Sequence, residues 1–165
     1  MGKIMNIHIS KSTGIASTEL SAFDNALFNA GIANYNLIYL SSVIPPRSII
    51  TVHENGIQSV AMPGEWGDRL YVVMAQNRTS VVGETVSAGI GWVQDPETKK
   101  GLFVEHEGHS EQEVKSLITH SLNDLMKTRG INFGDIHMQL NSIVCEDEPV
   151  CAMVVAMYQH EAWKV

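Results

Sequence analysis

The spacing of apolar residues along the chain predicts two amphipathic helices. The first covers residues 18–30, where Ser17 or Thr18 can accept hydrogen bonds from the free N–H groups at the helix start. Gly31 then suits the left-handed conformation in which helices commonly end. Four apolar side chains recur every three or four positions in this segment and are expected to face the core: Leu20, Phe23, Leu27 and Ala30.

The second helix has stronger sequence signals. Ser110 and Glu113 form a capping box, in which a hydroxyl and a carboxylate bind free backbone N–H groups at a helix start. Gly130 marks the expected end of this helix. One apolar stripe lies between these two points: Val114, Leu117, Ile118, Leu122 and Leu125.

Most of the remaining chain has the β-branched and aromatic composition of strands, bounded by turn residues. Pro45 and Pro46 interrupt the middle of the chain and cannot lie within a paired central strand. Two helices and about seven strands indicate one domain over residues 1–165 of the α+β class. We expect mainly antiparallel β-sheet layers covered by helices, as in an αββα-type sandwich. The expected strands are residues 4–10, 36–40, 69–75, 85–93, 102–107, 135–144 and 150–158.

The composition excludes several classes of partner. The formal net charge is −7 and the sequence has no basic cluster, so phosphate backbones are repelled and no nucleic acid is expected to bind. The sequence has no run of about eighteen apolar residues that could span a membrane. Polar residues interrupt residues 1–8 too early for a secretory signal. We therefore expect a cytoplasmic protein.

Two pairs of residues have the composition of redox or metal sites. Cys145 and Cys151 flank a short turn and could share one sheet face, but cytoplasmic thiols are expected to stay reduced and buried. The sequence alone leaves open whether they are bonded. His106 and His109 stand at a strand-to-helix junction, where nothing aligns the two rings, and zinc needs three or four convergent ligands. We expect no metal site there.

Residues 36–46 offer a different chemistry, because an apolar strand ends in Ser41 and Ser42 and is followed by Pro45 and Pro46. A Ser42 hydroxyl held against the Ser41 carbonyl could attack it, cut the chain and leave a pyruvoyl group at position 42. Such a rearrangement needs a closely held peptide, and stiff flanking prolines could help to hold one. By composition alone, the same residues also suit the ordinary end of a strand.

Four segments, in this order, resemble the pyruvoyl-dependent arginine decarboxylase family. Residues 20–32 contain an Ala-Phe-Asp helix with an Asn-Ala-Gly-Ile end. Residues 36–46 follow with Asn-Leu-Ile, Ser-Ser and Pro-Pro. Residues 83–88 and 101–108 resemble two further segments of the family. Each segment alone is modest evidence, but their order and spacing agree over most of the chain.

The resemblance implies a role for five residues. Ser41 and Ser42 would be the self-cleavage pair, and Ser42 would become the pyruvoyl group. Asn36 would position the scissile peptide during cleavage, and Glu105 would be the catalytic proton donor. Asp24 would bind the guanidinium group of the substrate, which suits a carboxylate because the two groups can pair bidentately.

The resemblance also implies the reaction and the assembly. The covalent pyruvoyl group, with no pyridoxal phosphate and no metal, would form a Schiff base with arginine and release CO₂ and agmatine. Cleavage would divide the zymogen into a β chain of residues 1–41 and an α chain of residues 42–165. These αβ protomers would form a homotrimer, or a dimer of trimers, with active sites at the subunit interfaces.

Two alternatives stay open from the sequence. The same chemistry could act on ornithine, lysine or another amino acid, because residues 1–17 and 60–66 match no family segment and such loops often set substrate choice. The chain could instead be an uncleaved, non-catalytic binding homologue. Nothing in the sequence distinguishes a role in polyamine synthesis from one in acid resistance.

Overall fold

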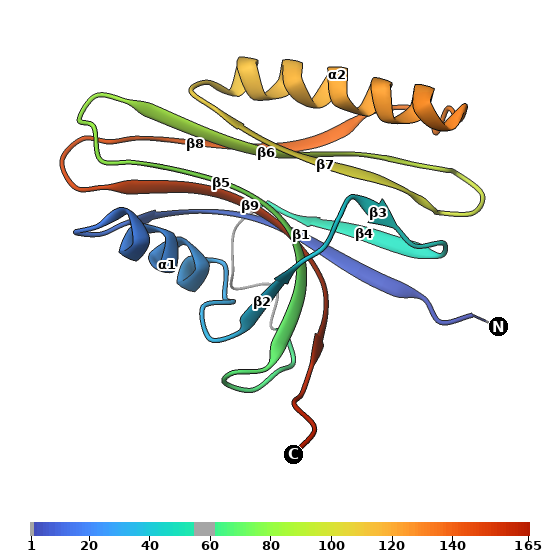
Figure 1. Ribbon diagram of the computed structural model, residues 1–165, viewed down its shortest axis with the longest axis horizontal. Helices are drawn as coiled ribbons and strands as arrows, with labels where there is room; N and C mark the ends of the chain where they lie inside the picture. The colour runs from blue at the N-terminus through green and yellow to red at the C-terminus, as the bar shows by residue number, and fades with distance from the viewer. Residues whose placement is uncertain (1, 55–61) are drawn as a thin grey trace.

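The computed structural model describes residues 2–54 and 62–165, which form two helices and nine strands (Figure 1). Both predicted helices are present, and the strands include two that the sequence did not predict. The elements are β1 (Met5–Ile15), α1 (Glu19–Asn29), β2 (Asn36–Tyr39), β3 (Val43–Ile44), β4 (Ser48–His53), β5 (Arg69–Thr79), β6 (Thr85–Gln94), β7 (Gly101–Gly108), α2 (Glu111–Arg129), β8 (His137–Val144) and β9 (Val150–Glu161).

The strands form two sheets that pack face to face. One sheet has the strand order β2-β5-β9-β1-β4, and the other has the order β3-β7-β6-β8. Five neighbouring pairs are antiparallel, whereas β1 with β4 and β2 with β5 are parallel. The predicted α+β class with mainly antiparallel sheets is therefore confirmed.

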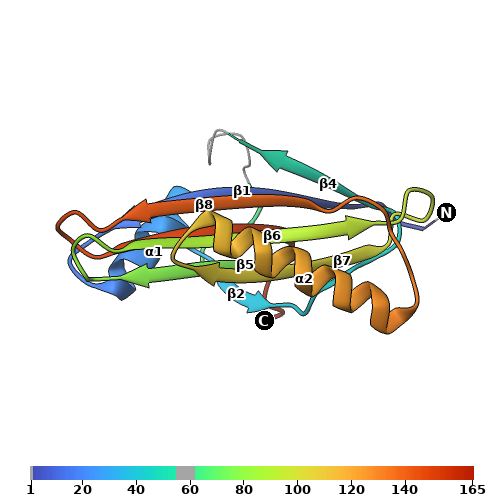
Figure 2. The same ribbon diagram turned by 90° about the horizontal axis from the view of Figure 1, so that it is seen from above.

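The molecule has four layers, in the order α2, four-stranded sheet, five-stranded sheet and α1 (Figures 1 and 2). Strand β9 shows why its sequence is almost continuously apolar. Ala152 and Val154 face the core between the sheets, whereas Met153 and Val155 face α1. Because both faces of this strand are covered, alternation between apolar and polar residues is lost.

Strand β1 extends beyond the predicted end at residue 10, although Lys11, Ser12 and Thr13 are polar. This part of the strand packs against α1 and is hydrogen-bonded to it. The Ser12 hydroxyl donates a hydrogen bond to the Ala26 carbonyl at 2.8 Å. A Cβ atom at Gly14 would overlap the Ala22 carbonyl, so only glycine allows the helix to lie this close to the strand.

The predicted ends of both helices are confirmed. Thr18 caps α1 by accepting a hydrogen bond from the Ser21 N–H, and Gly31 has a φ of 73°. Ser110 caps α2 in the same way, and Gly130 adopts the left-handed conformation. The prediction for Leu20 was wrong, because 68% of this residue is exposed on the outer face of α1.

Strands β3 and β4 were missed because they are short and lie at sheet edges. The proline pair lies between them, where it connects one sheet to the other without occupying a paired position. Strand β4 then pairs in parallel with β1 alone. The predicted segment 60–66 begins with two residues that lie outside the described part of the chain.

Both cysteines are free and buried, as expected, but they do not share a sheet face. Cys145 lies in the core between the sheets, and Cys151 faces α1. Burial raises the pKa of the Cys151 thiol to about 12, partly offset by Arg78, so this side chain behaves as a small apolar group. Neither helix is both long and apolar enough to cross a membrane, as judged over residues 2–54 and 62–165.

We expect Leu122→Ala to lower the free energy of unfolding by about 2–5 kcal/mol, because the Leu122 side chain is fully buried between α2 and its sheet. Leu117→Ala is the matched control on the same helix, where 37% of the residue is exposed, and should cost less than about 1 kcal/mol. Urea unfolding followed by circular dichroism measures both values. Equal losses would show that α2 does not pack as described.

Candidate active site

The chain passes from one sheet to the other at the serine pair. We call residues 40–44 the crossover segment. The Leu40 N–H donates to the Val72 carbonyl of β5 at 2.8 Å, and the Phe103 N–H of β7 donates to the Ser42 carbonyl at 2.7 Å. Ser41 therefore joins two residues that are held by different sheets.

A buried tyrosine holds the next residue of the crossover segment. The Tyr158 hydroxyl of β9 donates to the Val43 carbonyl at 3.1 Å, and its ring packs edge-on against Phe103 at a centroid distance of 6.1 Å. Burial, together with the negative charge of Glu105, raises the pKa of Tyr158 far above the usual value. This hydroxyl is therefore a permanent hydrogen-bond donor at neutral pH.

Ser41 lines a pocket of about 350 Å³ on the inner side of the crossover, which we call the serine pocket. Its wall includes Glu161, whose carboxylate accepts hydrogen bonds from Arg69 at 2.7 Å and from the Tyr71 hydroxyl at 3.0 Å. The charge of this carboxylate is thus balanced within the chain. The lining residues are Met5, Leu40, Ser41, Val43, Pro45, Tyr71, Tyr158, Gln159 and Glu161.

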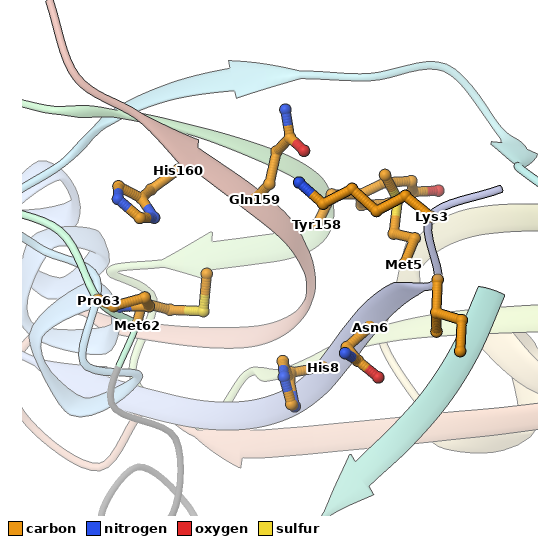
Figure 3. A pocket seen from close by; sticks show the side chains of 10 residues that line it. Lys3, Met5, Asn6, His8, Met62, Pro63, Tyr158, Gln159 and His160 are labelled. Atoms are coloured by element: carbon orange, nitrogen blue, oxygen red, sulfur yellow. The ribbon is translucent and has the colours of Figure 1, made fainter. Parts of the chain in front are cut away.

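Tyr158 also lines a second cavity (Figure 3). It has a volume of about 400 Å³ and shares Met5, Tyr158 and Gln159 with the serine pocket. His8 and His160 also line it, and neither pocket contains Asp24 or Glu105 among its lining residues. Tyr158 and Gln159, near the end of β9, therefore contribute to both cavities.

Glu105 lies on β7 two residues beyond Phe103, so both side chains extend from the strand face that meets the other sheet. Glu105 lines a small cavity with Tyr39, Met74 and Gln76. Partial burial raises the pKa of the Glu105 carboxyl, which is the direction that a proton donor requires.

The side chains that follow Glu105 on β7 alternate between the two faces of the strand. Glu107 shares the face of Glu105, and His106 extends to the opposite face, where its Nε2 lies 2.7 Å from the Ser121 hydroxyl of α2. Burial lowers the pKa of His106. His109 lies farther along the chain, with its Nδ1 3.6 Å from the Glu84 carboxylate. The two histidines thus have separate partners.

The structure does not bring Asn36 to the serine pair within one chain. Asn36 begins β2, and its side-chain amide donates to the Gly67 carbonyl at 2.8 Å. Leu40 follows the end of this strand and lies about 13 Å from Asn36, at 3.3 Å per residue of strand. A positioning role for Asn36 therefore stays a prediction.

Asp24 lies on the exposed face of α1, on an element that does not contribute to the serine pocket. Leu20 and Phe28 stand one turn before and one turn after it, with exposed fractions of 68% and 67%. A carboxylate between two exposed large apolar side chains is unusual for a solvated helix face. Its substrate-binding role also stays a prediction.

Sequence reasoning missed the groups that hold the crossover segment. Tyr158 stands at the end of an apolar run, where the sequence reads as a continuing strand. The Phe103 N–H is a backbone group and has no sequence signal. Arg69 and Glu161 pair across 92 positions of the chain, so only the fold brings them together.

These residues suit the class of enzymes that convert an internal serine into a pyruvoyl group. Formation of this group requires a serine hydroxyl next to the preceding peptide carbonyl, and Ser41 and Ser42 supply these groups within a segment that both sheets hold. The Phe103 N–H already binds the Ser42 carbonyl oxygen, which would remain beside the ketone of a pyruvoyl group. Glu105, a carboxyl with a raised pKa whose charge acts on Tyr158, lies on the same strand as Phe103.

Comparison with known proteins supports the same class. A family model described as "Pyruvoyl-dependent arginine decarboxylase (PvlArgDC)" matches residues 6–162, and the chain belongs to this family. A Thermococcus kodakarensis protein named pyruvoyl-dependent arginine decarboxylase is 30% identical over 152 residues, covering 90% of this chain and 91% of the relative. A protein of the same name from Halobacterium salinarum is also 30% identical, covering 92% of each chain.

We expect Glu105→Gln to raise the thermal midpoint at neutral pH. Folding raises the pKa of this carboxyl, so ionisation destabilises the folded chain at any pH above the pKa of the unfolded chain. The gain should shrink as the pH falls and vanish below the unfolded pKa of about 4.3. Thermal unfolding followed between about pH 4 and pH 8 tests this dependence.

Glu107→Gln removes a charge from the same strand face and supplies the background for this comparison. If the gain of Glu105→Gln over this control were the same at every pH, the folded chain would not shift the ionisation of Glu105.

Proposed function

We propose that the chain cuts itself between Ser41 and Ser42 and uses the resulting pyruvoyl group to decarboxylate arginine to agmatine and CO₂. One observation carries this proposal: Leu40 and Ser42 are held by different sheets, so the Ser41–Ser42 peptide lies within a segment that is fixed at both ends. Membership of the family supports the same reaction. The held peptide supplies the close positioning that attack by a neighbouring hydroxyl needs.

The self-cleavage reaction consumes one water molecule and releases one molecule of ammonia. The Ser42 hydroxyl oxygen attacks the Ser41 carbonyl carbon and the peptide C–N bond breaks, so an ester replaces the amide and Ser42 gains a free amine. Loss of the Ser42 α-proton then expels the Ser41 carboxylate and leaves dehydroalanine. Water replaces the nitrogen, which departs as ammonia, and a ketone next to the Ser42 carbonyl remains.

The pyruvoyl group supplies a ketone that condenses with the substrate α-amine and accepts the electron pair left by CO₂. The chain's own groups assist this chemistry. The Phe103 N–H, 2.7 Å from the Ser42 carbonyl oxygen, stabilises negative charge that develops on that oxygen. Partial burial raises the pKa of the Glu105 carboxyl, which favours its role as the group that delivers a proton to the substrate carbon.

The substrate guanidinium requires an anionic partner, and we propose that Asp24 of a neighbouring subunit supplies it. Within one chain, Asp24 lies on α1 and does not line the serine pocket. The exposed Leu20 and Phe28 around it form a surface that a second subunit would bury. A homotrimer of αβ protomers, or a dimer of trimers, would place this surface against the serine pocket of the next subunit.

Arginine is preferred over ornithine and lysine because a guanidinium pairs bidentately with a carboxylate, whereas an ammonium group binds as a point charge. Steady-state rates on the three amino acids test this preference. Faster turnover of ornithine or lysine would assign the substrate differently and leave the cleavage chemistry unchanged. An uncleaved chain without activity on any of them would favour the binding homologue.

We expect Ser42→Ala to remain one chain without activity, because the attacking hydroxyl is lost. Ser41→Ala is the matched control and should still cleave, since the reaction uses only the carbonyl of residue 41. Intact mass under denaturing conditions should show that the wild-type chain divides after Ser41. The larger fragment should be lighter than its serine form by one ammonia. A wild-type chain that never divides would refute the proposed function.

We expect co-expressed Asp24→Asn and Ser42→Ala chains to recover activity at low arginine concentration. If each site combines Asp24 of one subunit with Ser42 of the next, random mixing restores both residues in about a quarter of the sites. Asp24→Asn alone should be weak, because loss of a charge-assisted pair weakens binding about tenfold or more, and Ser42→Ala alone should be inactive.

Asp124→Asn makes the same chemical change on the exposed face of α2 and should leave arginine turnover unchanged. Mixed oligomers with no more activity than the sum of the two parents would place Asp24 and Ser42 of a site in the same subunit, or would remove Asp24 from the site.

A further inference from the structure

Strand β9 contains a bulge at Tyr158. Its partners in β5 are Val72 for Met157 and Tyr71 for Gln159, so Tyr158 has no partner in that strand. The pairing of β9 with β1 ends at Met157, opposite His8. Tyr158 is therefore the extra residue of a β-bulge, at the point where β9 curves away from β1 (Figure 1).

The alternation of β9 places the Tyr158 ring in the core between the sheets, on the same face as Val154 and Ala156. After the bulge, Gln159 lines the serine pocket together with Tyr158. The Tyr158 ring is 7% exposed and rests against Phe103, the residue whose N–H binds the Ser42 carbonyl. Packing thus fixes the ring, and the hydroxyl reaches the Val43 carbonyl at 3.1 Å.

Three strands consequently hold the crossover segment at consecutive points. Strand β5 binds Leu40, β7 binds Ser42, and Tyr158 of β9 binds Val43. The first two bonds join backbone groups and are independent of side-chain identity. The Tyr158 bond is the one of the three that a substitution can remove while the backbone pairing stays in place.

We propose that Tyr158 is a positioning residue for self-cleavage, whose hydroxyl fixes the Val43 peptide and thereby orients Ser42 against the Ser41 carbonyl. This inference rests on the proposed function. The hydroxyl touches Val43 and not the scissile peptide, so it acts through the backbone and not as an acid or base. A displacement of about 1 Å at a reacting atom can slow a reaction about a hundredfold, so a small rotation of this peptide is sufficient.

The test is the rate of self-cleavage of freshly synthesised chains, followed by intact mass. Tyr158→Phe keeps the ring against Phe103 and removes the hydroxyl, and should slow cleavage about tenfold to a hundredfold. Tyr35→Phe is the matched control, because the Tyr35 hydroxyl also donates to a backbone carbonyl, that of Met62, at 2.8 Å. The control should cleave at the wild-type rate.

Hydroxylamine separates a positioning role from a later chemical one, because it cuts the ester that forms when the Ser42 hydroxyl attacks. A Tyr158→Phe chain with a poorly oriented Ser42 forms little ester, so hydroxylamine should release few fragments that begin with an intact serine. Abundant fragments of that kind would show a block after ester formation and would overturn the proposal.

Two further outcomes are distinguishable. A wild-type chain that does not cleave refutes the proposed function and this inference together. A wild-type chain that cleaves, with Tyr158→Phe equally fast, refutes only the role of Tyr158.

A loss of stability must be separated from a loss of positioning. If Tyr158→Phe has a lower thermal midpoint than Tyr35→Phe, the cleavage rates are compared at temperatures equally far below each midpoint.

Discussion

The central constraint in this molecule is that one short segment belongs to both sheets. Leu40 is bonded to the five-stranded sheet and Ser42 to the four-stranded sheet, so the packing of the two sheets determines the geometry of the peptide between them. The core between the sheets, which includes Phe103 and Tyr158, therefore also fixes the site. Because protein interiors are close-packed and transmit small shifts, changes in this core reach the serine pair directly.

The site combines groups that stabilise the fold with groups that cost stability. The Tyr158 hydroxyl and the Glu161 carboxylate are hydrogen-bonded within the chain. Glu105 instead loses solvation without gaining a cationic partner among the interactions that shift its pKa. A carboxyl of this kind is retained at a cost to folding, which is typical of groups selected for chemistry.

The sequence predicted the parts of the fold that depend on local patterns. The caps of α2 at Ser110 and Gly130 and most of its stripe need only helical spacing and cap chemistry, and they were confirmed. Leu117 is the exception, because 37% of this residue is exposed. Leu20 was misplaced because its exposure depends on where α1 docks, which local spacing does not contain. In the site, Ser41 and Ser42 were readable as a motif, whereas the bulge at Tyr158 arises from the register of two strands and has no signature in either one.

If the chain is cut between Ser41 and Ser42 as proposed, the position of the crossover determines the fate of the two fragments. The shorter fragment would contain β1, which lies inside a sheet between β9 and β4, so the two fragments would be interleaved. They would form a non-covalent pair that cannot separate unless that sheet comes apart. Unfolding would then release two independent chains, and refolding would require a bimolecular encounter whose rate falls with dilution. The stability of the cleaved protein would therefore be kinetic. It would depend on a slow rate of unfolding, because the two fragments could no longer refold as a single chain.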